Sequence, residues 1–388
     1  MRICLVYDCL FPHTVGGAER WLRSVAERLA REGHEVTYLT LRQWDEGVDP
    51  GVPGVRVVEA GPRMALYTEG GRRRMLPPLV FGLGVLWHLL RRGGDYDVVH
   101  TASFPFFSLL AAAAVRPLRR FGLVVDWYEV WTRAYWEEYL GALGGRVGHL
   151  VQKLCVLAPQ RAFCFSSLAE RRLREEGLRG DVTVLRGMFE APDAREPSPA
   201  ASPPHVVYAG RHIPEKRVPA LVGALVEARK ELPELRATIF GDGPDRPEVL
   251  RLIEEHDAGS WLRAPGFVSS EEVQSAIRSA LCLVLPSRRE GYGMVIVEAS
   301  AAAVPAVVVA DDDNAAVELV DEGVNGTIAA SASAADLADA IVRVAAAGPA
   351  LRASTASWYA ERADRLSVGG SLETLVAAYG SGRPSVRA

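Results

Sequence analysis

The sequence predicts an α/β protein made of two Rossmann-like, doubly wound domains that face each other across a cleft. Three observations support this. Short, continuous apolar runs alternate with helical patterns along the chain, which is typical of parallel sheets covered on both faces. A stretch rich in Pro, Ala and Ser interrupts that alternation near the middle. With 388 residues, the chain is long enough for two domains, each with its own core.

The first half of the chain carries seven short apolar runs that we expect to be strands. Helical patterns lie between them, most clearly at residues 17–32 and 168–176. The most apolar stretch, residues 76–90, contains two prolines, two glycines and His88 and is shorter than the roughly 20 residues that span a bilayer. We expect a buried helix there. The predicted strands are residues 2–7, 35–41, 55–59, 97–100, 122–125, 162–166 and 182–185.

Residues 191–204 cannot build a core and are predicted to be an interdomain linker. Domains are therefore expected at 1–190 and 205–364, with a C-terminal helix at about 365–388 that packs back on the first domain. In the second half we expect strands at 205–209, 236–240, 262–264, 281–285 and 306–309. The helices between them are expected at 218–230, 247–255, 271–280 and 294–302, and the chain beyond 334 is expected to be helical.

Composition excludes several classes of protein. The hydrophobic fraction of 49% and the charged fraction of 24% are typical of a folded protein, and the formal net charge of −4 gives no reason to expect a nucleic-acid partner. The five cysteines are scattered without a C-x-x-C pair, which favours reduced core thiols in the cytoplasm over zinc or disulfides. The N-terminal apolar run is too short for a signal peptide. The sequence does not indicate an oligomeric state.

The strongest chemical signal is the loop that follows the predicted strand 281–285. It runs from Pro286 to Met294 and then enters a helix, so its glycines present backbone N–H groups and the positive end of the helix dipole, a ready phosphate site. Glu290 precedes the helix and Glu298 lies inside it, and carboxylates accept hydrogen bonds from sugar hydroxyls. The structural alternative is a helix-capping acid at Glu290 and a solvated Glu298.

Three further loops end strands of the same predicted sheet. Arg211 and Lys216 follow strand 205–209, and two cations at a strand end suit a diphosphate. Gly243 lies in the loop after strand 236–240. Phe267 and Val268 follow strand 262–264, where they could lie beside a base. Standing alone, each loop could be a solvated connection, but their gathering at one sheet edge favours a binding site.

In order, these loops read G-R-x-x-x-x-K, F-G-D-G-P, P-G-F-V and P-S-x-x-E-G-x-G-x-x-x-x-E. This order resembles the donor domain of family 4 glycosyltransferases, retaining enzymes with the GT-B architecture of two Rossmann-like domains, and the resemblance covers nearly the whole chain. It implies that Arg211 and Lys216 bind the donor diphosphate in place of a metal ion. It assigns the transferred sugar to Glu290 and the ribose to Glu298. Backbone contacts would come from Gly291, Tyr292, Gly293, Met294 and Val295, with Phe267 and Val268 near the base.

The resemblance places the acceptor on the first domain. Gly16 and Gly17 resemble the family's N-terminal glycine loop, which would approach the donor phosphate and the reaction centre. Many relatives carry a histidine after the strand that here ends at Asp126, and Tyr128 stands in its place. A tyrosine with an ordinary pKa near 10 is a poor general base. Asp126 and Glu129 are therefore the expected acceptor-side carboxylates, and His100 is expected to be a hydrogen-bonding residue at a strand end.

Three further features admit a structural interpretation. Trp127 and Trp131 suit aromatic packing as well as sugar stacking. Asp311 to Asp313 suggest a metal site, but with no second ligand cluster we expect a solvated loop. The basic run from Arg72 to Arg74 is expected to be a solvated loop, and the alternatives are an acceptor-binding loop or a peripheral contact with anionic lipid.

The sequence thus predicts a retaining, metal-independent glycosyltransferase that needs no cofactor beyond its nucleoside-diphosphate-sugar co-substrate. The acceptor would be a natural product, glycolipid or polysaccharide hydroxyl, and the source a high-GC bacterium. The alternatives are a sugar-nucleotide 2-epimerase or hydrolase on the same architecture, or a non-catalytic sugar-nucleotide-binding subunit. The base, the sugar and the acceptor are not indicated.

Overall fold

A computed structural model describes residues 1–14, 16–66, 68, 73–188 and 199–381. The chain divides into two compact units. Unit 1 comprises Met1–Thr68, Arg72–Glu190 and Ser367–Ala388, and unit 2 comprises Glu69–Gly71 and Ala191–Leu366. Most of the predicted linker, residues 191–198, lies outside the described residues. The rest of it is attached to unit 2, where Ala201 N–H donates to Ser279 O over 2.9 Å.

Unit 1 is built on a seven-stranded sheet in which every neighbouring pair is parallel. The strand order is β3-β2-β1-β4-β5-β6-β7, so the order reverses at β1, as in a doubly wound sheet. All seven predicted strands are confirmed, with ends that shift by at most two residues. They are β1 Arg2–Val6, β2 Glu35–Leu41, β3 Val55–Gly61, β4 Val98–Ala102, β5 Gly122–Trp127, β6 Arg161–Cys164 and β7 Val182–Val184.

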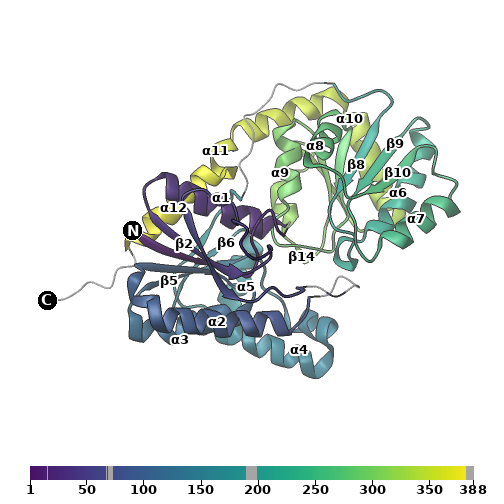
Figure 1. Ribbon diagram of the computed structural model, residues 1–388. Coiled ribbons are helices and arrows are strands. Elements are labelled where there is room, and N and C mark those ends of the chain that lie inside the picture. The colour runs from purple at the N-terminus through teal and green to yellow at the C-terminus, as the bar shows by residue number, and fades with distance from the viewer. Residues whose placement is uncertain (15, 67, 69–72, 189–198, 382–388) are drawn as a thin grey trace. The chain divides into compact units, whose positions relative to one another are not determined.

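Helices cover both faces of this sheet (Figure 1). α1 buries Trp21, Leu22, Val25 and Leu29 at a spacing that places them on one helix face. α12 packs beside it, and α2, α3 and α4 form the layer on the other face. The helices of unit 1 are α1 Gly17–Arg31, α2 Leu76–Arg92, η1 Gly93–Asp95, α3 Phe106–Arg119, α4 Arg133–Leu157, which is kinked at Gly141, α5 Ser167–Glu175 and α12 Val368–Ser381.

The expectation of a buried helix at residues 76–90 is only half correct. α2 buries Phe81, Val85 and Leu89 against its own unit, but its opposite face exposes Leu83 and Trp87. The sequence is apolar on both faces of the helix, and the fold covers only one of them. Among the described residues, no helix is long and apolar enough to cross a membrane.

Unit 2 is built on a six-stranded sheet, also parallel throughout, in the order β10-β9-β8-β11-β13-β15. The prediction of two parallel α/β sheets is therefore confirmed. β15 Gly326–Ala329 and a small ladder of β12 Arg289–Glu290 with β14 Asp313–Asn314 were not predicted. The other strands are β8 His205–Ala209, β9 Arg236–Phe240, β10 Leu262–Gly266, β11 Cys282–Leu285 and β13 Ala306–Val309.

The helices of unit 2 follow the predicted pattern closely, and residues 334–381 are largely helical, as expected. They are η2 Pro214–Lys216, α6 Val218–Glu231, α7 Arg246–Glu255, α8 Ser270–Ser279, α9 Met294–Ala301, η3 Ala315–Leu319, α10 Ala334–Ala360 and α11 Ala363–Leu366. Because all strands of each sheet run in the same direction, the loops that carry the candidate residues leave each sheet at one edge.

Candidate functional site

The loop after β8 carries Arg211 and Lys216 away from the sheet of unit 2. The Tyr208 hydroxyl donates to Arg211 O over 2.9 Å and so fixes the start of the loop, while the Arg211 side chain is exposed. Burial raises the pKa of Tyr208, the Glu290 carboxylate raises it further, and Arg211 opposes them. Both charged groups therefore lie within electrostatic range of one buried hydroxyl. Lys216 ends the short helix η2, two residues before α6 begins.

Lys216 and Glu290 meet directly, although 74 residues separate them in the chain. Lys216 Nζ lies 2.5 Å from Glu290 Oε1, and the Ser287 hydroxyl donates to the same oxygen over 2.9 Å. The side chains of Lys216 and Glu290 remain 17% and 13% exposed, so the pair is held in place and still reaches solvent. This geometry creates a compact site with one cation and one carboxylate. Ser287 belongs to the predicted loop, but no role was predicted for it.

The loop of Glu290 is fixed by hydrogen bonds to the next strand connection. Asn314 is buried, and its Nδ2 donates to Val309 O over 2.8 Å and to Ser287 O over 3.2 Å. β12 pairs with β14, so that Glu290 stands opposite Asn314. These contacts hold the carboxylate in place without closing it off from solvent. Sequence reasoning missed Asn314, because two-residue strands carry no periodic signal.

Two glycines of the site are required by the backbone. Gly243 has φ +152°, and a Cβ there would lie 2.4 Å from His212 O, so only glycine lets the two loops approach this closely. Gly293 has φ +105° and precedes α9, where a Cβ would crowd Ala316. Gly291 and Met294 flank it with intermediate burial. The first N–H groups of α9 have no acceptor within the helix, which leaves donors available for an anion.

The other residues predicted to bind the nucleotide-sugar donor differ in how far they are buried. Tyr292 is buried, and Val295 has intermediate burial on the first turn of α9. Glu298 lies one turn further, where Gln274 Nε2 donates to its Oε2 over 3.1 Å. Phe267 is 74% exposed after β10, beside the partly buried Val268. An aromatic ring left in solvent at this sheet edge is a surface on which a planar ligand group could stack.

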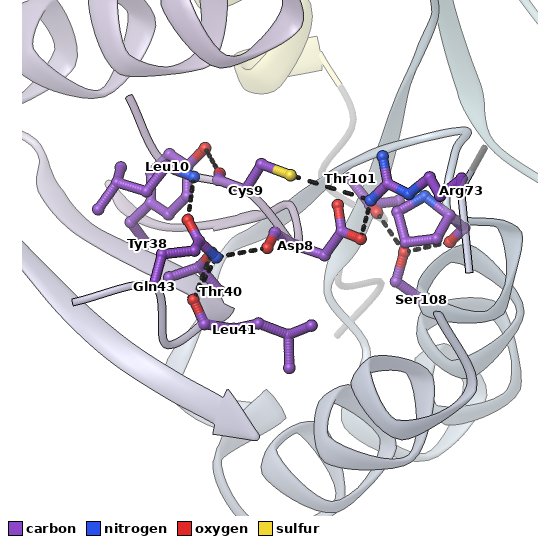
Figure 2. A network of polar contacts seen from close by, with 11 residues as sticks. Asp8, Cys9, Leu10, Tyr38, Thr40, Leu41, Gln43, Arg73, Thr101 and Ser108 are labelled. Carbon is purple, nitrogen blue, oxygen red and sulfur yellow. Dashed lines mark hydrogen bonds and ion pairs between the residues drawn. The ribbon is translucent and has the colours of Figure 1, made fainter. Parts of the chain in front are cut away.

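In unit 1 the strand-end carboxylate of β1 forms an ion pair that the sequence did not predict. Asp8 is completely buried and pairs with Arg73 (Figure 2). The Arg73 guanidinium also lies 4.7 Å from the Phe104 ring centroid. Gln43 braces the same segment, donating to Asp8 O over 2.7 Å and accepting from Leu10 N–H over 2.8 Å. The expectation that the basic run is a solvated loop is wrong for Arg73. Arg72 lies outside the described residues.

His100 and Asp126 form a buried polar chain. His100 Nε2 lies 2.8 Å from Asp126 Oδ1, and Trp21 Nε1 donates to Asp126 Oδ2 over 2.7 Å. His100 Nδ1 lies 2.7 Å from the Tyr379 hydroxyl of α12. His100 has polar partners, as expected, but it is the middle residue of β4 and not its end. The expectation that Asp126 faces an acceptor is not met, because it is 0% exposed and both of its oxygens have partners within unit 1.

Tyr128 and Glu129 are the predicted acceptor-side residues that remain closer to the surface. The Tyr128 ring stacks on Phe165 with centroids 5.3 Å apart, and burial raises the pKa of its hydroxyl well above 10.0, with Asp126 adding to the effect. Within the described part of the chain, that hydroxyl has no hydrogen-bond partner. Glu129 accepts from Trp131 Nε1 over 2.8 Å. The Tyr128 hydroxyl is therefore a buried, protonated donor without a partner in the described part of the chain.

The two tryptophans near these residues have structural roles. Trp127 is buried and donates to Gln160 Oε1 over 2.9 Å. Trp131 packs against Tyr135 and Trp136, with ring centroids 4.7 Å and 4.6 Å away. Burial and a hydrogen bond thus hold Trp127, and Trp131 belongs to an aromatic cluster.

The glycine loop before α1 is shaped by a glutamate. Gly16 is the N-cap of α1 in extended conformation and Gly17 is its first residue. A Cβ on Gly16 would lie 2.3 Å from Glu19 Oε2, so the carboxylate folds over this glycine. The loop therefore packs against a buried carboxylate, in addition to offering the backbone groups that the sequence indicated.

Asp311 to Asp313 do not gather other ligands around them. Asp311 Oδ2 pairs with Arg217 Nη2 at 3.2 Å, and its Oδ1 accepts from Asp313 N–H over 3.3 Å. Across the described residues, no group of three or more His, Cys, Asp or Glu side chains comes together that could hold a metal ion. All five cysteines are buried free thiols.

The fold and these loops have counterparts in known proteins. Residues 15–187 match the family model "Glycosyltransferase Family 4", and residues 191–356 match the model "Glycosyl transferases group 1". Glycogen synthase of Mycobacterium tuberculosis is 28% identical over 333 residues, which cover 79% of this chain and 77% of that protein. The class defined by the fold and the matches is that of the GT-B glycosyltransferases. Within it, the chain belongs to family 4, the group 1 glycosyltransferases.

Solved structures agree on the fold over almost the whole length. Sucrose-phosphate synthase from Thermosynechococcus elongatus superposes with a TM-score of 0.79 at 20% identity, covering 98% of both chains. The Anabaena protein HepE, solved in complex with UDP-glucose, gives a TM-score of 0.71 at 17% identity and covers 98% of this chain and 100% of its own. At these identities the likeness supports the architecture alone.

Proposed function

We propose that this glycosyltransferase moves a sugar from a nucleoside-diphosphate donor to an acceptor hydroxyl with retained anomeric configuration, and that it does so without a metal ion. The observation that carries the proposal is the contact of Lys216 with Glu290 beside the exposed Arg211. A diphosphate needs cations and a sugar needs hydroxyl acceptors, and this sheet edge offers both within one site.

The diphosphate of the donor would bind Lys216, and the sugar of the donor would bind Glu290. Without a ligand, each charge neutralises the other. A bound diphosphate would draw Lys216 and Arg211 to its oxygens, and the Glu290 carboxylate would then accept hydrogen bonds from the sugar hydroxyls. Ser287, which donates to Glu290 over 2.9 Å, would keep the carboxylate oriented during this exchange. HepE, a protein of the same fold, has been solved with UDP-glucose, which is a donor of this chemical class.

The rest of the donor would follow the same edge of the sheet. The phosphates would accept hydrogen bonds from backbone N–H groups in the segment from Gly291 to Val295, where α9 begins. Glu298 would accept from the ribose hydroxyls in competition with Gln274. The exposed Phe267 ring would lie near the base, with Val268 beside it.

The chemical step would rest on leaving-group stabilisation. As the bond from the sugar to the phosphate breaks, negative charge grows on the departing diphosphate, and Arg211 and Lys216 would stabilise it more strongly than the ground state. The acceptor hydroxyl would attack from the face that the phosphate leaves and give its proton to the phosphate oxygen. This route needs no protein nucleophile and retains configuration.

On the acceptor side, Tyr128 supports the proposal better than Asp126 does. Its hydroxyl is a donor without a partner among the described residues, whereas both oxygens of Asp126 are engaged. Tyr128 would donate to an acceptor oxygen, and Glu129 would accept from an acceptor hydroxyl. The raised pKa of Tyr128 makes proton removal by its phenolate negligible at neutral pH, so its role would be orientation.

The test begins with a thermal-shift screen of UDP-, GDP- and dTDP-sugars to find the donor, followed by incubation of the labelled donor with candidate acceptors. NMR of the product is expected to show transfer with retained anomeric configuration, at a rate unchanged by EDTA. An inverted product would contradict the stereochemistry, and a loss of activity that Mg²⁺ or Mn²⁺ restores would contradict metal independence. Hydrolysis or epimerisation of the donor without transfer would contradict the function.

A further inference from the structure

The exposed apolar side chains of this protein are concentrated on one face of unit 1. Among the described residues, twelve of the sixteen exposed large apolar side chains lie on α2, α3 and α4 or at the residue that precedes α2. Scattered exposed leucines are ordinary on any protein surface, but a concentration on three adjacent helices marks an interaction site. Figure 1 shows these helices on the side of the sheet opposite α1 and α12.

On α2 the exposed residues form a single stripe. Leu76, Leu79, Leu83, Trp87 and Leu90 follow one another at intervals of three or four residues, which keeps all five on one helix face. Leu83 and Trp87 are 66% and 58% exposed. The buried residues of α2 lie on the opposite face, so the helix has one apolar face turned to the core and another turned to solvent.

α4 repeats this arrangement after its kink. Leu143, Val147, Leu150, Leu154 and Leu157 are all about half exposed or more, at intervals of four, three, four and three residues. Its core-facing side is formed by other residues, including the buried Gln152 and Cys155. A helix that is apolar on two faces normally lies inside a protein. Within the described part of the chain, no layer covers the outer face of α2 or of the second part of α4.

α3 joins these two helices into one surface. Phe107 of α3 packs so closely on α2 that a Cβ on Gly82 would lie 2.5 Å from the Phe107 Cβ. On its other side, Phe106 O lies 3.5 Å from Cys155 Sγ of α4, and Arg116 Nη1 donates to Pro159 O over 2.5 Å. α3 also adds the exposed Leu118. We call the outer surface of α2, α3 and residues 142–157 the apolar face.

The charges of the apolar face have one sign. No Asp or Glu occurs in α2, in α3 or in residues 142–157, although the chain as a whole has a net charge of −4. The exposed charged residues are basic: Arg91 and Arg92 on α2, Arg119 on α3, Arg146 and Lys153 on α4. Of the neighbouring acids, Asp95 lies 3.5 Å from Arg92 and Glu137 lies 3.9 Å from Arg146, while Glu176 pairs with His149 at 2.9 Å.

We propose that the apolar face docks on a lipid bilayer that contains anionic lipids. The leucines would enter the boundary between headgroups and acyl chains, and the Arg and Lys side chains would extend to the lipid phosphates. The guanidinium of Arg91 lies 3.8 Å from the Trp87 ring centroid, which joins a cation to an aromatic ring of the kind enriched at membrane interfaces. The proposal does not depend on the donor site, because it concerns unit 1 alone.

The charge pattern disfavours a second copy of the chain as the occupant. In a two-fold symmetric dimer the same patch forms both sides of the interface, so a cationic margin would meet a cationic margin. An anionic bilayer instead supplies the missing negative charge over the whole surface.

The full-length protein can be tested by sedimentation with vesicles of phosphatidylcholine alone or of phosphatidylcholine and phosphatidylglycerol in equal amounts. We expect binding to the anionic vesicles at least about tenfold tighter than to the neutral ones, and weaker in high salt. The double variant Leu83→Glu/Leu150→Glu should lose at least about tenfold in vesicle affinity, because both changes place a carboxylate in the apolar face. Both positions are exposed, so thermal melting should stay unchanged.

The matched control is Leu250→Glu, which changes an exposed leucine on α7 of unit 2 and should bind vesicles like the unmodified protein. Three results would overturn the proposal. The first is an absence of vesicle binding, and the second is equal binding of the double variant and the control. The third is a dimer, seen by light scattering without lipid, that the double variant converts to monomers while anionic vesicles bind neither form.

Discussion

Two strand-end carboxylates of this protein, Glu290 in unit 2 and Asp126 in unit 1, have similar positions in the fold and opposite environments. Glu290 meets Lys216 and Ser287 and keeps 13% of its side chain in solvent. Asp126 meets His100 and Trp21 and has no exposed surface. The first carboxylate can exchange its partner for a ligand, whereas the second is locked into the core by two elements of its own unit.

The comparison shows why position at a strand end is not enough to identify a binding residue. Carboxyl ends of parallel strands gather ligand-binding loops, but they also carry the polar groups that anchor neighbouring helices. An ion pair between a carboxylate and a flexible lysine that still reach solvent can be exchanged for contacts to a ligand. A fully buried carboxylate with a partner at each oxygen is structural, because removing a partner leaves a charge stranded in the interior.

The largest effect is expected for Glu290→Ala. Removing the carboxylate leaves the sugar hydroxyls without their acceptor, and turnover should fall by about 10³-fold or more, the scale seen when a preorganised transition-state contact is lost. The measurement is the rate of sugar transfer at saturating donor. Glu248→Ala, which alters an exposed glutamate on α7 of the same unit, should transfer at the unmodified rate. Retention of more than a tenth of the activity by Glu290→Ala would break the contrast with Asp126.

Asp126→Asn is expected to act on stability instead. The change leaves the buried His100 without its charged partner, and breaking such a pair costs about 3–5 kcal/mol. Unit 1 should then unfold roughly 10 °C earlier, since about 2–4 °C accompany each kcal/mol in a domain of this size. Differential scanning calorimetry measures the shift. Asp45→Asn, at an exposed ion pair with Arg63, is the control and should melt normally. An unchanged melting temperature for Asp126→Asn would contradict the structural role.

Glu298→Ala should weaken nucleotide binding while leaving turnover at saturating donor nearly intact. A ribose hydroxyl donating to a carboxylate is worth about 1.5–3 kcal/mol, which corresponds to at least about tenfold in affinity. Calorimetric titration of the nucleotide measures this effect. Gln274→Ala removes the present hydrogen-bond partner of Glu298 and should leave affinity equal or slightly higher. Unchanged affinity in Glu298→Ala would exclude it from the donor site.

Tyr379→Phe should have the smallest effect. It deletes the hydroxyl that meets His100 Nδ1 without changing the packed volume, and one buried hydrogen bond contributes about 1 kcal/mol. Unit 1 should melt a few degrees lower. In a protein that already carries Asp126→Asn, Tyr379→Phe should lower the free energy of unfolding by less than it does alone, because both residues contact the same histidine. Strict additivity of the two changes would show that they are not one network.

The sequence was most informative about the regular elements. The predicted bounds of β2, β8, β9 and β13 are those of the structure. Their apolar runs are bounded by residues that end strands, such as Gly, Pro and charged side chains, so local pattern alone determines them. The gathering of Lys216 and Glu290 at one edge could also be predicted, because both follow strands of the same parallel sheet.

Features that depend on distant contacts could not be predicted. Asp8 and Arg73 are 65 residues apart, and the sequence around each of them does not indicate that they form an ion pair. Burial of Asp126 depends on Trp21 and His100, which come from other elements. α2 is apolar on two faces, and the sequence cannot tell which of them the rest of the chain covers. In each case tertiary packing decides which residues are paired or buried, and the periodicity of the sequence does not predict that packing.

The central claim is that the edge of unit 2 around Lys216 and Glu290 binds a nucleoside diphosphate. Isothermal titration of UDP, GDP and dTDP into the full-length protein and into Arg211→Ala tests it most directly, with Arg251→Ala on α7 as the control for an exposed arginine of the same unit. One nucleotide should bind the unmodified protein and the control equally, and Arg211→Ala at least about tenfold more weakly. Absence of binding for all three nucleotides, or equal affinity in Arg211→Ala, would contradict the account.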